Sequence, residues 1–556
     1  MSIFKRQLAE RRPDRSARRW LYVPYDQLSD GMGPLSREEP GELGIVLIES
    51  TWKAARRPYH KQKLALVLAN QRHFALEQAA RGVAVRYEVT DGPYRDALAT
   101  AIAELGPLRV MEPAERELHA DIEPLAASGS LEIIEHEGWL TNAQQFEASQ
   151  RRGPRWRMDA FYRRVRRERG ILMEDGKPVG GKFSFDAENR TPWTGEPPAP
   201  APPHFPLDPI KTEVGALIDG RFGDHPGTLD LAALPATARD AEALWGWAKA
   251  NCLHDFGPYE DAMSIRSAGL FHTRISALLN LHRLLPTRVV DEALASDAPL
   301  NSIEGFVRQV VGWREFVRHV HRATDGFRDL PAGAAPVEAT PGDGGYERWS
   351  GRRWPAESTE PIGDGGAASS ELGAQEPLPQ AFWGRRSGFH CLDRVVSDVW
   401  ATGYGHHITR LMVLANIATL LDVTPRELAD WFWVAYTDAY DWVVEPNVLG
   451  MGSFALGELM TTKPYVSGAA YINRMSDFCA DCPFDPKRDC PLTSLYWSFL
   501  ARHEEKLADN PRLRLPLASL GRRSPESRHN DAEVFDWVRD TLAAGGELRP
   551  GEQPGG

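Results

Sequence analysis

The sequence predicts a protein with an N-terminal α/β domain, built on a parallel sheet, and a large C-terminal domain made only of helices. Before residue 142, five short apolar segments alternate with amphipathic helical patterns, which is typical of a Rossmann-like parallel sheet with helices on both faces. From residue 236 the strand signals stop and only helical patterns follow. A chain of 556 residues is also too long for one ordinary core, so we expect at least two domains.

The elements of the first domain follow from periodicity and burial pattern. We expect strands over 20–25, 44–50, 83–89, 108–113 and 131–137, and helices over 60–82, 94–106 and 114–129. No G-x-G-x-x-G follows the first strand, so dinucleotide binding of the usual kind is not indicated. Ligands bind such sheets at the carboxyl ends of strands, where Asp26 and Glu49 lie. The alternative for both acids is a solvent-facing loop position.

Composition shifts divide the chain further. Residues 191–211 are rich in proline and indicate a linker, and 324–378 are rich in Gly, Pro, Ala and Glu, as in a flexible insertion. The expected divisions are a basic tail (1–17), the α/β domain (18–142), a linker with a basic stretch (143–235), the helical domain (236–545) and a C-terminal tail (546–556).

The net charge of −12 argues against general nucleic-acid binding. Residues 151–169 nevertheless hold nine arginines with interleaved aromatics, and Lys182 follows. Arginine forks suit phosphate oxygens and aromatic rings stack on bases; a solvated basic helix is the alternative. No apolar run is long enough to span a membrane, and five cysteines suit a reducing compartment. We therefore expect a cytoplasmic protein with no membrane partner, as a monomer.

Three of the five cysteines, Cys479, Cys482 and Cys490, lie within a dozen residues. A C-x-x-C pair with a third cysteine after a short loop is typical of a metal centre. Cys391 or Cys252 would supply the fourth thiol. The spacing alone fits a structural zinc site as well as an iron–sulfur cluster.

The helical half carries other polar and aromatic candidates. His406 and His407 open a helix and point about 100° apart, so one can face a pocket while the other packs. Asp438, Asp441 and Asn447, with Glu445, could hydrogen-bond an electron-poor ring or only cap a turn. Trp383 and Trp431 could pass single electrons to a redox cofactor, or only pack in the core.

Several long motifs together resemble one family. They are FGPYEDAM (256–263), LFHTRISALLNLHRLLP (270–286), FVRQVVGWREF (306–316), GYGHHITRLMVLAN (403–416), DAYDWVVEPNVLGM (438–451) and KPYVSGAAYINRMSDFCADC (463–482). The chain resembles the iron–sulfur bacterial cryptochromes and photolyases, which include the prokaryotic (6-4) photolyases. The resemblance implies photolyase/cryptochrome architecture, with an antenna domain followed by a helical domain that holds FAD.

The resemblance also implies the cofactor residues. It assigns Cys391, Cys479, Cys482 and Cys490 to a 4Fe-4S cluster, leaving Cys252 as a buried thiol. It places Asp26 and Glu49 at a 6,7-dimethyl-8-ribityllumazine antenna. The flavin-region matches are Thr273, Arg274, Ser276, Trp313, Arg314, Asp438, Asp441 and Asn447.

The implied activity is light-driven repair of pyrimidine–pyrimidone (6-4) photoproducts in ultraviolet-damaged DNA, by an electron from reduced FAD and a proton from a histidine. His407 matches the active-site histidine, with His406 beside it. Met451, Tyr465 and Tyr471 match the lesion pocket, and Trp383 and Trp431 the electron-transfer chain. Residues expected on DNA phosphates are Arg155, Arg157, Arg163 and Lys182.

The sequence departs from the pattern of this family at two positions, and two alternative functions remain open. Phe432 stands where some relatives carry a tyrosine of the electron-transfer chain, so Trp433 or another aromatic would have to substitute. Val444 stands where relatives often carry an acid, with Glu445 adjacent. A blue-light photoreceptor without repair activity is one alternative function. A helical DNA-binding protein with a structural zinc is the other.

Overall fold

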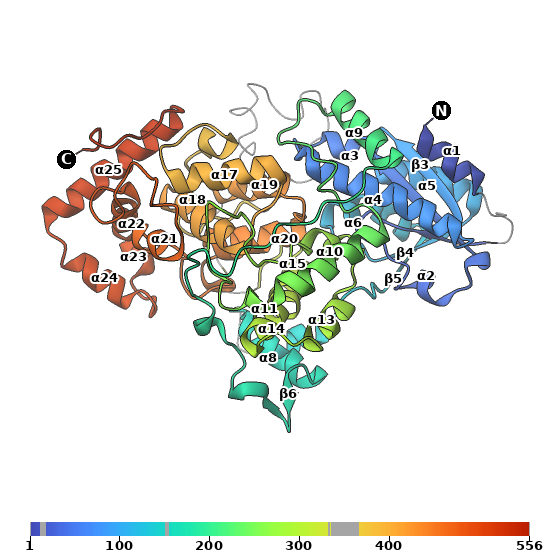
Figure 1. Ribbon diagram of the computed structural model, residues 1–556, viewed down its shortest axis with the longest axis horizontal. Coiled ribbons are helices and arrows are strands. Elements are labelled where there is room, and N and C mark those ends of the chain that lie inside the picture. The colour runs from blue at the N-terminus through green and yellow to red at the C-terminus, as the bar shows by residue number, and fades with distance from the viewer. Residues whose placement is uncertain (1, 12–17, 151–154, 332–333, 335–365, 555–556) are drawn as a thin grey trace.

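The computed structural model describes residues 2–11, 18–150, 155–331, 334 and 366–554. The sheet domain and the helical domain lie at opposite ends of an elongated molecule (Figure 1). The insertion expected over 324–378 and the basic stretch over 151–169 lie partly outside the described residues. Within the described residues, no helix is long and apolar enough to cross a membrane.

Five parallel strands form the predicted sheet, in the order β3-β2-β1-β4-β5. Every residue of β2, which lies between β3 and β1, is buried, because helices cover both faces of a parallel sheet. The fold class and all five predicted strands are confirmed. Their bounds are β1 (Arg19–Tyr22), β2 (Leu43–Ser50), β3 (Ala84–Thr90), β4 (Leu108–Met111) and β5 (Leu131–Ile134).

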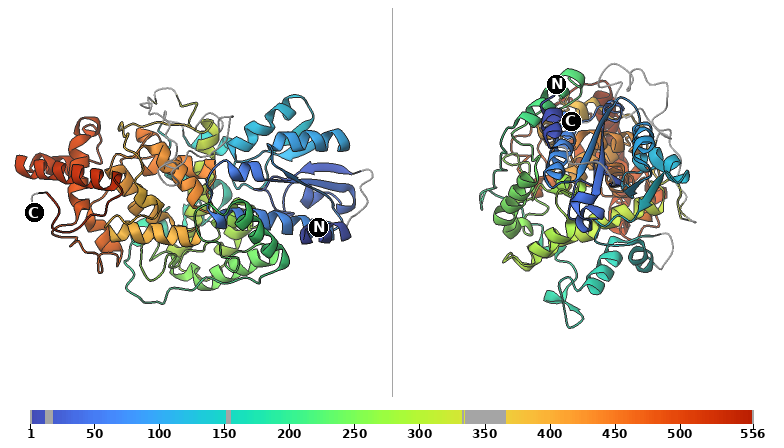
Figure 2. Two further views of the ribbon diagram at one scale, coloured as in Figure 1. Left: turned by 90° about the horizontal axis from the view of Figure 1, so that it is seen from above. Right: turned by 90° about the vertical axis from the view of Figure 1, so that its right-hand side faces the viewer.

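Helices pack around this sheet, and one of them, α4, joins the sheet domain to the helical domain (Figures 1 and 2). At the start of α4, the backbone N–H of His60 donates to the Val434 carbonyl at 2.8 Å. Lys63 Nζ donates to the carbonyls of Trp433 and Ala439 at 2.8 and 2.6 Å. The helices are α2 (Pro34–Arg37), α3 (Thr51–Ala55), α4 (Lys61–Ala80), α5 (Tyr94–Leu105), α6 (Arg116–Ala127) and α7 (Ala143–Ser149).

Two segments expected as tail or linker pack against the sheet domain. Residues Ile3–Glu10 form α1 rather than a loose basic tail, and Phe4 is buried. The Glu213 carboxylate on α9 (Pro209–Arg221) accepts from the Ile3 backbone N–H at 2.6 Å and so fixes the start of α1. Between the domains, α8 (Met158–Arg169) and the hairpin of β6 (Met173–Glu174) and β7 (Lys177–Pro178) project from the body (Figures 1 and 2).

The second domain is helical, as predicted. One apolar core runs from the sheet's inner face through this domain, and a smaller core including Phe4 and Phe74 covers the outer face of the sheet. The helices are α10 (Ala238–Asn251), α11 (Leu253–Phe256), α12 (Ser276–Asn280), α13 (Pro286–Leu294), α14 (Leu300–Val307), α15 (Glu315–Ala323), α17 (His390–Thr402), α18 (Asn416–Leu420), α19 (Pro425–Ala435), α20 (Asp441–Glu445), α21 (Ala469–Met475), α22 (Pro491–Arg502), α23 (Glu504–Leu507), α24 (Arg514–Gly521) and α25 (Pro525–Ala543).

Three π-helical segments interrupt these helices. They are η4 (Arg308–Arg314), η6 (Thr409–Ala415) and η7 (Pro446–Gly452), and η6 contacts η7. Such segments occur mainly at functional sites, because the extra residue re-aims neighbouring side chains. All three carry or flank residues that the sequence singles out, so this region is the first place to look for a site.

Candidate active site and cofactor sites

A cluster of three histidines lies at the start of η6. The His272 and His406 rings stack with 4.4 Å between centroids and 12° between planes, and the His407 ring meets His272 edge-on at 5.4 Å. Ring nitrogens of all three lie within 4.8 Å of one another. Stacked rings direct their lone pairs along parallel planes, which does not suit two ligands of one metal ion. The stacked pair is therefore poorly arranged for binding one metal ion.

The two buried histidines stay uncharged at neutral pH. Burial lowers the pKa of His406 and of His272 well below the usual range, and the neighbouring imidazoles lower both further. Both ring nitrogens of His406 are buried without a hydrogen-bond partner among the described residues. His407 is 37% exposed and its Nε2 lies 3.6 Å from Asp261 Oδ1. As the sequence predicts, one histidine faces outward and its neighbour packs.

The tyrosines assigned to the lesion pocket lie on the same side as His407. Asp261 and Arg190, 3.6 Å apart, are neighbours of Tyr471. Arg190 also lies near Tyr465. Met451 is half-buried on η7. The region around the partly exposed histidine thus holds a carboxylate, a guanidinium and two aromatic rings.

Asp438 organises a second polar network, between α12 and η6. Its carboxylate accepts from Ser276 Oγ at 2.7 Å and from Arg410 Nη2 at 3.0 Å, and its carbonyl accepts from Asn280 Nδ2 at 2.8 Å. Arg314 Nε in turn donates to Asn280 Oδ1 at 3.2 Å. Three of the expected flavin residues thus belong to one network.

Other expected flavin residues are placed differently. Arg274 stacks its guanidinium 4.3 Å from the centre of the Tyr404 ring, and Thr273 is buried beside it. Trp313 packs edge-on against Phe316. Asn447 is used locally, because its Nδ2 donates to the Val443 carbonyl at 2.7 Å.

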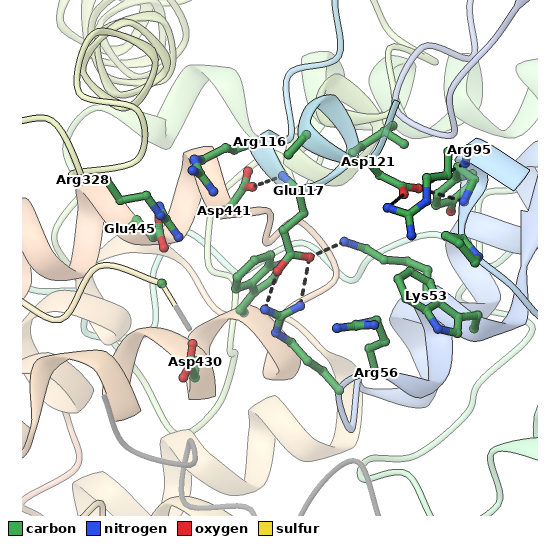
Figure 3. Close-up of a pocket in the computed structure, with 18 of the residues that line it drawn as sticks. Lys53, Arg56, Arg95, Arg116, Glu117, Asp121, Arg328, Asp430, Asp441 and Glu445 are labelled. Carbon is green, nitrogen blue, oxygen red and sulfur yellow. Dashed lines mark hydrogen bonds and ion pairs between the residues drawn. The ribbon is translucent and has the colours of Figure 1, made fainter. Parts of the chain in front are cut away.

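Asp441 faces a different cavity, of about 280 Å³, between the two domains. Figure 3 shows that the side chains lining it carry both charges. Glu117 Oε2 lies 2.7 Å from Lys53 Nζ and 3.0 Å from Arg57 Nη1, while the Asp441 carboxylate accepts from the Glu117 backbone N–H at 3.2 Å. Asp441 therefore does not join the Asp438 network.

Asp26 is buried next to this cavity, and neither of its carboxylate oxygens has a hydrogen-bond partner among the described residues. The same holds for the hydroxyls of Tyr22, Tyr25 and Tyr440 and for Glu115 Oε2. Burial raises the pKa of Asp26 to about 7. Buried polar atoms without partners are rare in folded proteins and indicate a missing ligand or ordered water.

The carboxylate of Glu49, in contrast to that of Asp26, has hydrogen-bond partners. It accepts from Arg72 Nε and Nη2 at 2.9 and 2.8 Å and from the Tyr87 hydroxyl at 2.6 Å. An arginine fork and a phenol satisfy both oxygens, so only Asp26 of the two expected antenna acids is left with free acceptors.

The two predicted electron-transfer tryptophans are connected through a third. Trp383 stacks on Trp400 with 5.4 Å between centroids and 16° between planes. Trp400 meets Trp431 edge-on at 5.7 Å. The ring series runs from the buried Trp431 on α19 to the half-buried Trp383.

The four cysteines expected at a metal centre converge where α17 and α22 begin. Cys391 lies in the first turn of α17, Cys490 caps α22, and Cys479 and Cys482 lie on the preceding loop. Burial, and then the other three thiols, raise the pKa of Cys391 well above the usual range. Cys252 lies elsewhere, buried with its Sγ 3.8 Å from the His272 carbonyl.

The sulfur atoms of the four cysteines are not tightly clustered. All four cysteines are described, and no three of their sulfur atoms lie within 4.8 Å of one another. A cavity of about 540 Å³ opens beside Cys479 and Cys482.

Comparison with known proteins shows the family of the chain. Residues 21–233 match the family model of deoxyribodipyrimidine photo-lyase-related proteins. A (6-4) photolyase of Agrobacterium fabrum is 33% identical over 528 residues, which cover 91% of this chain and 96% of that protein. The chain belongs to the photolyase and cryptochrome family.

Solved structures of photolyases and cryptochromes share the fold. A bacterial class III photolyase from Agrobacterium tumefaciens superposes with a TM-score of 0.51 at 15% identity, covering 95% of this chain and 99% of the other. A cryptochrome of Synechocystis sp. PCC6803 gives 0.53 at 14%, covering 94% and 99%.

In this photolyase-family chain the expected phosphate-binding side chains are paired internally. Arg155, Arg163 and Lys182 are exposed and pair with Glu458, Asp159 and Glu188 at 3.0, 2.9 and 2.7 Å. Exposed pairs exchange partners at little cost. Arg157 differs, because its Nη1 donates to the Trp156 and Glu458 carbonyls at 2.8 and 2.9 Å and so holds the local backbone.

Sequence reasoning missed four residues of the photolyase-family site. His272 and Asp261 lie inside motifs that carry the resemblance, so their motifs could have drawn attention to them. Arg410 follows His406 by one helical turn, which periodicity could have shown. The spacing of residues along the chain could not have pointed to Trp400, because its ring neighbours come from η5 (Gln380–Trp383) and α19.

Proposed function

We propose that this protein is a light-dependent DNA-repair enzyme that reverses pyrimidine–pyrimidone (6-4) photoproducts with FAD held in the helical domain. The observation that carries the proposal is the histidine arrangement. An outward-facing imidazole lies beside Asp261, and two buried imidazoles lie behind it. The (6-4) photolyase of Agrobacterium fabrum, 33% identical across nearly the whole chain, supports the same reaction.

The residues present fit a buried flavin. His406 presents two ring nitrogens, and Tyr436 a hydroxyl, that are buried without partners among the described residues, so the region has acceptors and donors to satisfy a polar ligand. Ser276, Arg410 and Asp438 would hold it together with Arg274. When bound there, reduced FAD would supply, on absorbing blue light, the electron that the lesion needs.

His407 supplies the proton in this proposal. It would donate a proton to the lesion and recover that proton after the bond between the bases breaks. The lesion reaches His407 by flipping out of the duplex, which a distorted base pair makes less costly. Tyr465, Tyr471 and Met451 would pack around the flipped bases, and Arg155, Arg163 and Lys182 would bind flanking phosphates.

Two further cofactors belong to the proposal. The four converging cysteines would hold a 4Fe-4S cluster that clamps α17 to the loop before α22. The unsatisfied Asp26 and the hydroxyls around it would bind the antenna 6,7-dimethyl-8-ribityllumazine, in and behind the cavity of Figure 3. Trp431 and Trp383 would belong to the path that reduces the flavin in light.

Absorbance and DNA binding test this proposal together. Purified protein should show flavin bands and a broad iron–sulfur absorbance, and should bind a duplex with one (6-4) photoproduct more tightly than the undamaged duplex. A colourless protein with stoichiometric zinc would contradict it. The alternative, a blue-light receptor, shares the fold of the Synechocystis cryptochrome; it predicts flavin absorbance with equal affinity for both duplexes.

A further inference from the structure

Trp431 has four aromatic neighbours among the described residues. Its ring lies 5.3 Å from Phe432, 5.5 Å from Phe382, 5.7 Å from Trp400 and 6.0 Å from Tyr436. A phenylalanine such as Phe382 is too difficult to oxidise. Trp433 is a further candidate, two residues along α19. The question is which of these rings passes the electron, since Phe432 stands where some relatives carry a tyrosine.

Positive charges argue against two of the candidates. Arg57 lies 3.9 Å and Lys53 5.9 Å from the centre of the Trp433 ring. Arg410 lies 3.9 Å from the centre of the Tyr436 ring. A ring that gives up an electron becomes a cation, and a neighbouring cation in a region of low dielectric raises the energy of that state. Phe432 is itself too difficult to oxidise.

The Trp400 ring, in contrast, has no positively charged side chain over it among the described residues, neither a lysine nor an arginine. The His60 ring stacks on it at 5.8 Å with 12° between planes. Burial lowers the pKa of His60 to about 4, so His60 is uncharged at neutral pH and adds no positive charge.

One backbone carbonyl accepts hydrogen bonds from both Trp400 and Trp431, and it stabilises positive charge on either ring. Trp400 Nε1 donates to the Phe382 carbonyl at 2.9 Å, and Trp431 Nε1 donates to the same oxygen at 2.8 Å. The carbonyl dipole stabilises a radical cation on either indole. A carbonyl oxygen is too weak a base to take the indole proton, so the positive charge is not trapped there and can move to the next ring.

We propose that Trp400 is the intermediate electron carrier between Trp431 and Trp383, in place of a tyrosine at position 432. This inference rests on the proposed flavin site. Bound oxidised flavin would supply the light-activated oxidant, and Trp431 would be the ring that gives up one electron to it. Trp400 then reduces Trp431, and Trp383 reduces Trp400. The half-buried Trp383 regains its electron from an external thiol, the reductant of the sequence.

Photoreduction of the full-length protein tests this assignment. Protein carrying oxidised FAD is illuminated with blue light in the presence of dithiothreitol, and loss of oxidised flavin absorbance is followed over time. Trp400→Phe removes the carrier and keeps the packing. Trp433→Phe removes the competing ring, and Trp497→Phe on the distant α22 is the matched control. We expect Trp400→Phe to slow photoreduction by about tenfold or more, with both other variants close to wild type and flavin content unchanged in all.

Trp400→Tyr gives a second, independent readout. A tyrosine loses its proton on oxidation, so photoreduction should slow in D₂O for this variant and not for wild type. Repair by chemically reduced protein should be unaffected in every variant. Wild-type rates in a flavin-loaded Trp400→Phe, or slowing by Trp433→Phe alone, would overturn the assignment. Should the Phe variant lose its flavin, a Trp400→Tyr variant without a solvent isotope effect would overturn it. Wild-type protein without flavin would instead refute the proposed function itself.

Discussion

The rings of His272 and His406 lie face to face, 4.4 Å apart. A proton on either ring would sit beside a second imidazole in a buried site, where both desolvation and repulsion oppose it. The pKa values of both are accordingly depressed. Of the three rings, His407 is the one that meets both solvent and a carboxylate.

Replacing His407 with asparagine should abolish repair while leaving the cofactors bound. We expect the repair rate under blue light to fall about 10²- to 10⁴-fold, the usual contribution of a general acid, with flavin content and photoreduction unchanged. His529→Asn on α25, an exposed histidine far from the site, is the control. Repair at the wild-type rate by His407→Asn would refute the assigned role.

Asp438 should be required for flavin retention and for stability. Asp438→Asn leaves the Arg410 guanidinium without its carboxylate partner, and breaking such a largely buried pair costs about 3 kcal/mol. Urea unfolding and the flavin-to-protein ratio measure the two effects. Asp159→Asn, which breaks the exposed pair with Arg163, should change stability by less than about 1 kcal/mol.

Asp26 should make the antenna-free protein less stable as pH rises. Folding raises the pKa of this acid to about 7, so its stabilising protonation is complete below about pH 4 and is lost as pH rises through 7. Asp26→Asn keeps a neutral side chain at all pH values. The variant should match wild type in unfolding free energy near pH 4 and exceed it at pH 8. Parallel pH profiles would contradict the burial of an uncompensated carboxylate.

Cys391 should matter more than Cys252 for holding the helical domain together. Cys391→Ser removes one of four converging thiols, so we expect loss of iron, of solubility and of flavin together. Cys252→Ser alters a buried thiol outside the cluster and should keep iron. A Cys391→Ser protein that stays folded, brown and active would show that the centre is not a structural clamp.

Sequence patterns predicted the sheet well, because alternation of apolar and amphipathic segments directly reflects burial on two faces. The first helix of the chain was harder to predict. Residues 3–10 look like a basic tail, yet α1 forms because Glu213, more than 200 positions away, accepts from its first N–H groups. Local composition carries no information about such a partner.

The residues of the candidate site were likewise predictable only in part. Motif matches singled out Asp438 and Ser276, which hydrogen-bond each other, and His407, which lies beside Asp261. They placed Asp441 and Glu49 at ligand positions, whereas the structure pairs Glu49 with Arg72 and directs Asp441 into the interdomain cavity. Trp400 escaped notice because stacking between segments far apart in the chain leaves no periodic trace.

Repair of a defined lesion tests the central claim most directly. Protein with fully reduced FAD is mixed with a duplex oligonucleotide that contains one (6-4) photoproduct, illuminated with blue light, and the strands are resolved chromatographically. The account predicts restoration of the two intact pyrimidines in wild type, dependent on light, and its loss in His407→Asn. An unchanged (6-4) lesion after illumination of flavin-loaded, fully reduced wild-type protein would contradict it.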